Sequence, residues 1–133
     1  MEVTRIIHPI GQGAFYTESI KTNDNLYNVV YDCGSGNHKY TPKRLKQDIA
    51  SFYNPDDVID LLFISHFDND HINGIRELKK RTSNIRNIVV PLIEENDFWY
   101  YQIENPSFET FYRSLSEIAD SAVYRVKPYN EDE

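Results

Sequence analysis

The sequence predicts an α/β fold, in which strands of one sheet alternate along the chain with helices. Three observations support this class: apolar, β-rich runs at residues 26–32, 58–64 and 87–93, segments with helical periodicity between them, and an ordinary globular composition. Strand–helix–strand–helix–strand in this order is typical of a sheet with right-handed crossovers. At 133 residues the chain is expected to form a single domain spanning residues 1–133.

The amino-terminal part predicts three strands. Residues 3–10 form the first, with isoleucines at three positions and Pro9 near its end. Residues 14–21 and 26–32 form two more, joined by the turn sequence Thr22-Asn23-Asp24-Asn25. Because residues 26–31 are mostly apolar and rich in β-formers, we expect that strand to be covered on both faces.

The middle of the chain predicts two helices around a central strand. Thr41-Pro42 suits a helix start, as N-cap and first-turn proline. One apolar stripe follows at i, i+4, i+7 and i+8, formed by Leu45, Ile49, Phe52 and Tyr53. The strand at residues 58–64 is followed by a short helix at residues 74–81 and by the strand at residues 87–93.

The last third predicts a helix, a short strand and an aromatic segment. Residues 94–105 carry four aromatic side chains in a row, Phe98 to Tyr101, which predicts either a short helix or an aromatic loop. Ser107 is expected to cap a helix with a wide apolar face, formed by Phe108, Phe111, Tyr112, Leu115, Ile118 and Ala119. Residues 122–126 predict a final strand, and residues 128–133 an acidic tail.

Charge and cysteine content narrow the range of expected partners and cellular compartments. The net charge of −7 repels polyanions over the molecule as a whole. Two basic runs oppose it, at residues 39–46 and 76–86, and a solvated helix face is their simplest explanation. The single cysteine, Cys33, excludes an internal disulfide, no apolar run approaches the roughly 20 residues of a membrane span, and residues 1–5 lack a signal-peptide layout. We therefore expect a cytoplasmic protein with no membrane segment.

The most informative stretch runs from Leu61 to Gly74. Its apolar start predicts a buried strand, and four potential metal ligands follow within six positions: His66, Asp68, Asp70 and His71. Side chains two positions apart in an extended segment leave on the same face, and Asn69 tolerates a sharp turn that brings the second pair round. Imidazole and carboxylate groups are ligands for Zn²⁺, Mn²⁺ and Fe. The alternative is a solvated Asp-rich turn after a strand.

The pattern His66-x-Asp68-x-Asp70-His71 resembles the signature motif of the metallo-β-lactamase superfamily. The commonest form of that motif has histidine where this chain has Asp68. The present form, preceded by Ser65, resembles the branch that includes the soluble domains of bacterial DNA-uptake (competence) channel proteins. An oxygen ligand in place of nitrogen adds negative charge and shifts the metal preference toward harder ions such as Mn²⁺. The resemblance is strongest over residues 1–93 and implies the N-terminal αβ half of a metallo-β-lactamase-type sandwich (αβ/βα).

The resemblance also implies a function. It implies a metal-dependent hydrolase that activates water on one or two ions, Zn or Mn, to cleave an ester or phosphodiester, with a nucleic-acid-type substrate favoured. His66, Asp68, Asp70 and His71 would hold the metal, and Asp70 would also orient the nucleophile. Asp32, in the sequence Asp32-x-Gly34, would support the site from beneath. A local Asx-turn is the alternative for Asp32.

The sequence has no histidine after His71, whereas the resembled enzymes draw further ligands from later in their chains. Either the chain is a fragment or borrows ligands from a partner, or it is a non-enzymatic binding or assembly module that retains the fold. An isolated αβ half exposes sheet edge and apolar surface, so we expect self-association or packing on a missing C-terminal half. His8 and His38 lack ligand spacing to a partner and are expected to be structural or surface residues.

Overall fold

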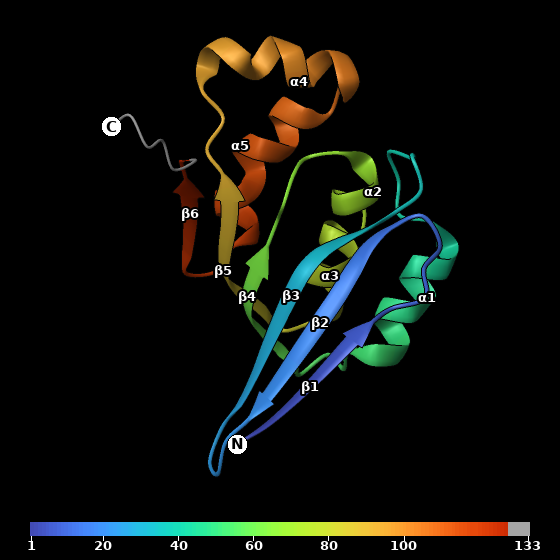
Figure 1. Ribbon diagram of the computed structural model, residues 1–133, viewed down its shortest axis with the longest axis vertical. Coiled ribbons are helices and arrows are strands. Elements are labelled where there is room, and N and C mark those ends of the chain that lie inside the picture. Colours follow the sequence, from blue (N-terminus) through green and yellow to red (C-terminus); the bar gives the residue numbers. More distant parts are fainter. Residues whose placement is uncertain (128–133) are drawn as a thin grey trace.

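A computed structural model describes residues 1–127, and the predicted tail at residues 128–133 lies outside them. Within residues 1–127, six strands form one mixed sheet in sequence order (Figure 1). They are β1 (Glu2–Ile7), β2 (Gly13–Lys21), β3 (Leu26–Ser35), β4 (Val58–Phe63), β5 (Asn84–Pro91) and β6 (Ala122–Val126). The first three strands pair antiparallel, and β3 to β6 pair parallel. The predicted α/β class is confirmed.

In the described part of the chain, five helices flank the sheet: α1 (Lys43–Phe52), α2 (Asn69–Ile72), α3 (Ile75–Arg81), α4 (Phe98–Glu104) and α5 (Phe108–Ile118). A short 3-10 turn, η1 (Glu95–Asp97), precedes α4, so residues 98–104 are helical rather than an aromatic loop. Figure 1 shows α3 and α5 behind the strands, where the core lies. That core joins the apolar faces of α1, α3 and α5 to strand side chains such as Val30, Leu62 and Ile88. Within residues 1–127, no helix is long and apolar enough to cross a membrane.

The opposite face of the sheet is open to solvent. The strand register aligns one row across it: Ile7, Tyr16, Tyr31, Phe63, Val89 and Tyr124. The Tyr31 ring stacks on Phe63 at 5.0 Å between centroids, yet Tyr31 is 37% exposed and Tyr124 55% exposed. The prediction that β3 would be covered on both faces is therefore wrong, because the core helices pack against the other side.

Several boundaries differ from the sequence-based expectation for local reasons. Strand β1 ends at Ile7 rather than Ile10, because Pro9 has no N–H to donate and the N–H of Ile10 turns back to the carbonyl of His8. Strand β3 continues beyond Asp32 to Ser35, because Asp32 forms a bulge in β3, with a positive φ of 56°, after which the pairing with β2 resumes. Strand β5 begins three residues early, at Asn84, because its pairing with β4 begins there.

Two predicted caps are also corrected. Pro42, not Thr41, occupies the N-cap of α1, and the Thr41 hydroxyl donates instead to the carbonyl of Asn73 at 2.5 Å. Ser107 occupies the N-cap of α5, but its hydroxyl makes no capping bond. Its N–H is instead bound by the side-chain oxygen of Asn105 at 3.1 Å. The side chains of Thr41 and Asn105 therefore hold these two helix starts in place.

Candidate metal centre

The motif begins where β4 ends. The N–H of Ile64 donates to the carbonyl of Val89, which keeps the chain beside β5 for one more residue. Phe67 then turns into the core, is 3% exposed and packs edge-on against Phe108 at 5.2 Å. Because side chains alternate along an extended segment, burying Phe67 directs His66 and Asp68 outward.

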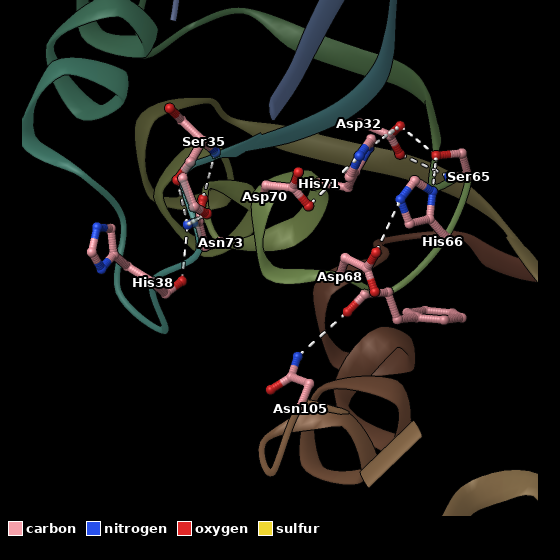
Figure 2. Close-up of polar contacts among 12 residues, drawn as sticks. Asp32, Ser35, His38, Ser65, His66, Asp68, Asp70, His71, Asn73 and Asn105 are labelled. Carbon is pink, nitrogen blue, oxygen red and sulfur yellow. Dashed lines mark hydrogen bonds and ion pairs between the residues drawn. The ribbon is translucent and has the colours of Figure 1, made fainter. Parts of the chain in front are cut away.

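Three of the four predicted ligands come together in the structure. His66, Asp70 and His71 each offer one ligand atom, and these atoms lie within 4.8 Å of one another (Figure 2). The Nε2 atom of His71 is 3.6 Å from Oδ1 of Asp70, and the two imidazole rings are 3.7 Å apart between centroids. The single turn of α2 produces this proximity, because it places Asp70 and His71 beside the extended strand end that carries His66. We refer to these three residues as the triad.

Asp68 lies outside the triad. Its carboxylate is 3.5 Å from Nε2 of His66, and its side chain is 70% exposed. Asp68 has extended backbone at the N-cap position of α2, so it precedes the helical turn that carries Asp70 and His71.

Asp32 lies beneath the triad and contacts it directly. Its Oδ2 atom accepts from Nδ1 of His71 at 2.9 Å and from the Ser65 hydroxyl at 2.5 Å, and its Oδ1 accepts from the Ser65 N–H at 2.7 Å. The Ser65 hydroxyl is also 2.9 Å from Nδ1 of His66. These partners are 33 and 39 positions away, so a local Asx-turn does not describe this side chain. A carboxylate on Nδ1 fixes the tautomer of His71 that leaves Nε2 free toward Asp70.

Two glycines allow the strands to approach α2. A Cβ atom on Gly34 would lie 2.5–2.6 Å from backbone atoms of Asp70 and His71, and one on Gly13 would lie 2.7 Å from the carbonyl oxygen of Asp70. Real Cβ contacts are never this short, so any larger residue displaces the helix turn that carries two of the ligands. The sequence Asp32-x-Gly34 is thus one structural unit: the aspartate binds the motif and the glycine makes room for it.

Asn73 is a site residue whose role the sequence did not reveal. Its side chain accepts from the N–H of Ser35 at 2.9 Å and donates to the carbonyls of Ser35 and His38 at 2.8 and 2.9 Å. Figure 2 shows it reaching from the end of α2 to both residues. It therefore ties the loop after β3 to the motif. Its place two residues after the motif, before Gly74, is the one available signal in the sequence.

The remaining histidines and the cysteine lie elsewhere. His8 is 6% exposed, its Nε2 is 2.9 Å from the Thr17 hydroxyl and its ring stacks on Phe15. Burial lowers the pKa of His8, against the opposing effect of Asp48 nearby. Burial also raises the pKa of the Cys33 thiol far above its usual range, which leaves it unreactive. His38 is exposed on the loop after β3.

The triad suits a divalent metal. Ligands that each lie about 2.0–2.2 Å from one ion are no more than about 4.4 Å apart. The 3.6 Å between Nε2 of His71 and Oδ1 of Asp70 satisfies this limit, and all three ligand atoms of the triad lie within 4.8 Å of one another. Two imidazoles and one carboxylate form a donor set that Zn²⁺ and Mn²⁺ accept, and three protein ligands leave a position open for water. Within residues 1–127 no second group of three such side chains is found.

Comparison with known proteins adds one finding. The family model described as "Metallo-beta-lactamase superfamily" matches residues 22–122, which is most of the chain. The matched range contains Asp32, Gly34, Ser65 and the whole motif at residues 66–71. No curated protein and no solved structure matches the sequence.

Proposed function

Because the chain belongs to the metallo-beta-lactamase superfamily, we propose that it is a metal-dependent hydrolase whose ion is held by His66, Asp70 and His71. The observation that carries this proposal is the convergence of these three ligands above Asp32, which already binds Nδ1 of His71. A divalent ion held there, Zn²⁺ or Mn²⁺, supplies a Lewis acid and lowers the pKa of a coordinated water toward neutrality.

Each side chain has a distinct task in this proposal. Asp32 and Ser65 orient the two imidazoles, so that the ligand atoms are in place before an ion arrives. Asp70 would hold the ion and orient the attacking water. Asp68, 3.5 Å from His66 and largely exposed, would complete the set as a ligand of the same ion or of a second one.

The substrate we favour is a phosphodiester of nucleic-acid type, with other esters second. The support is the motif itself, since the form with Asp68 resembles the nucleic-acid-related branch of the superfamily. We further propose that residues 1–133 form one domain that acts in the cytoplasm, where a free, buried Cys33 is stable. We also propose that the open face of the sheet is covered, by self-association of this chain or by packing on a C-terminal half.

The decisive experiment combines metal analysis with an activity assay. We expect the purified protein to contain about one Zn or Mn per chain. We expect His66→Ala and Asp70→Ala to lose more than about 100-fold in hydrolysis of bis(p-nitrophenyl) phosphate, because even outer-shell changes cost 10–100-fold. His38→Ala is the matched control, since His38 is an exposed histidine outside the triad, and its activity should remain at the wild-type level. Full-length protein that binds no metal contradicts the proposal.

A second candidate is a non-enzymatic binding or assembly module that keeps the fold and a structural ion. One observation favours it: within residues 1–127 the structure gathers ligands for one ion only. Stoichiometric metal binding without hydrolysis of esters or phosphodiesters would support the module. Turnover that is lost on chelation and restored by Zn²⁺ or Mn²⁺ would support the enzyme.

A further inference from the structure

Two pockets meet beside the triad. The first, which we call the acidic pocket, has a volume of about 270 Å³ and contains Asp68, Asp70 and Glu104 in its lining. The second, the basic pocket, has a volume of about 380 Å³, and its lining includes the polar and aromatic side chains of Lys39, Tyr40, Arg76, Ser107 and Thr110. Within residues 1–127 no carboxylate lines the basic pocket, although the whole chain has 21 acidic residues.

Asn69 and Asn105 line both pockets and form the wall between them. The side-chain nitrogen of Asn105 donates to the side-chain oxygen of Asn69 at 3.0 Å, and Asn105 is 5% exposed. Figure 2 shows Asn105 approaching the motif from the segment between α4 and α5. Because Asn69 directly precedes Asp70, the basic pocket lies next to a candidate metal ligand. A ligand with one group in each pocket would lie across this pair of amides.

The two cations in the basic pocket lack acidic partners. Within residues 1–127 neither Lys39 nor Arg76 forms an ion pair. Arg76 donates to the Ser114 hydroxyl at 3.1 Å, and Nζ of Lys39 lies 5.7 Å from the Tyr40 ring centroid. Other members of the same basic runs are neutralised, as when Lys79 pairs with Asp120 at 2.7 Å. Two uncompensated cations that converge from separate segments on one pocket create a local positive potential, which favours an anionic ligand despite the net charge of −7.

We propose that the basic pocket binds the nucleotide next to the scissile phosphodiester, with its phosphate between Lys39 and Arg76 and its base on the exposed ring of Tyr40. This assignment rests on the proposed function, because it places the scissile group in the acidic pocket. Arginine suits phosphate through its planar fork of donors, and lysine through its compact charge. Tyr40 is 77% exposed, so one face of its ring is available to stack on a base.

The first test measures binding without turnover. The probe is fluorescein-labelled tetrathymidylate, titrated by anisotropy into protein kept metal-free with a chelator. We expect Arg76→Gln and Lys39→Ala each to weaken binding about ten-fold. Each should also make the negative slope of the log association constant against log salt concentration shallower by about 0.7. Tyr40→Ala should weaken binding without changing that slope. Lys80→Ala is the matched control, because Lys80 is an exposed cation on the same helix as Arg76, and it should bind like wild type.

The second test uses activity. Arg76→Gln should raise KM for tetrathymidylate about ten-fold, whereas the control Lys80→Ala should keep the wild-type KM for tetrathymidylate and the wild-type kcat on bis(p-nitrophenyl) phosphate. The four substituted side chains are all exposed, so their variants should keep the wild-type unfolding midpoint; they are Lys39, Tyr40, Arg76 and Lys80. A Lys39 or Arg76 variant that binds the oligonucleotide as tightly as Lys80→Ala overturns the assignment. Displacement of the probe by inorganic phosphate as readily as by thymidine monophosphate overturns it too.

Failure of this inference and failure of the proposed function give different results. Charge-dependent oligonucleotide binding by a protein that holds no metal and hydrolyses nothing would retain the basic pocket as a nucleotide site and remove the enzyme. Metal-dependent hydrolysis by a protein whose oligonucleotide affinity does not change in the Lys39 and Arg76 variants would retain the enzyme and remove the nucleotide site.

Discussion

Asp32 and His71 are 39 positions apart in the chain, yet the carboxylate of the first and Nδ1 of the second lie 2.9 Å apart. The contact joins β3 to α2, and the Ser65 hydroxyl extends it to His66. Asp32 is 6% exposed and adopts a positive φ of 56°, a conformation that costs free energy in any residue other than glycine. Three hydrogen bonds to its carboxylate offset that cost and tie the strand end to both histidines.

The first prediction concerns the charge of Asp32. Asp32→Asn keeps the size of the side chain and tolerates positive φ, but it removes the negative charge that holds His71. We expect metal affinity to fall about ten-fold or more, measured by competition with a chromophoric chelator. Asp60→Asn is the control, because Asp60 is a carboxylate of the same sheet that pairs with Arg86. Affinity equal to wild type in Asp32→Asn would remove Asp32 from the metal centre.

A second prediction tests whether Asp68 contacts the metal. If it does, Asp68→His exchanges an oxygen ligand for an imidazole nitrogen, and the ratio of Zn²⁺ to Mn²⁺ affinity should rise. Isothermal titration of the metal-free protein with each ion gives that ratio. The exposed Asp24, in the turn between β2 and β3, supplies the control Asp24→His. An identical ratio in wild type and Asp68→His means that Asp68 is not a ligand.

Local patterns in the sequence predicted most of the fold and the identity of the motif. The αβ arrangement implied by the family resemblance agrees with the observed six-stranded sheet flanked by helices. Apolar residues repeat every two positions in strands and every 3.6 in helices, and these repeats and the composition of turns are local features of the chain. For this reason β6 and the apolar face of α5 were predicted correctly.

Other features depend on contacts between distant residues, which periodicity does not report. The exposure of Tyr31 depends on which face of the sheet the helices cover. The bond between Asn69 and Asn105 joins residues 36 positions apart, and the role of Asn73 depends on a loop 35 to 38 positions away. The close approach of Gly34 to α2 likewise becomes visible only in the folded chain.

A third prediction tests that close approach. Gly34→Ala places a methyl group within 2.6 Å of the backbone of Asp70 and His71, and we expect a loss of about 1–3 kcal/mol in the free energy of unfolding. Metal affinity should fall as well, because the displaced turn carries two ligands. Urea unfolding and chelator competition measure the two effects. Gly11→Ala is the control: its φ of 82° is strained, but no atom lies within 4 Å of the added carbon, so metal affinity should be retained. Wild-type stability in Gly34→Ala would contradict the close packing.

The fourth prediction concerns pH. Burial lowers the pKa of His8 in the folded state below its unfolded value of about 6.5, despite the opposing effect of Asp48. Below that pH the unfolded chain binds the proton more readily than the folded chain does, so His8 should make stability fall as the pH drops from about 7 toward the folded pKa. Thermal unfolding of metal-free protein at pH 7.5 and pH 5 should therefore show a smaller difference for His8→Gln than for wild type. The exposed His38 gives the control His38→Gln, whose pH dependence should match wild type. If the stability of His8→Gln changes between pH 7.5 and pH 5 as much as that of wild type, groups other than His8 cause the pH dependence.

The last prediction concerns the open face of the sheet. Its central row places Tyr16, Tyr31 and Phe63 in contact across three strands, and this aromatic surface faces solvent although apolar faces of this kind are usually covered. Two such faces pack at about 10 Å when sheets stack, so we expect the isolated chain to form dimers whose population grows with concentration. Sedimentation velocity between 5 and 200 µM (about 40-fold in range) measures the fraction of dimer. Tyr31→Lys should shift the equilibrium toward monomer, because a dimer of this variant would bury a charge at the interface. Lys21→Ala, at an exposed position at the end of β2, should leave the equilibrium unchanged. A wild-type monomer throughout that range would mean that this face does not pair with a second copy.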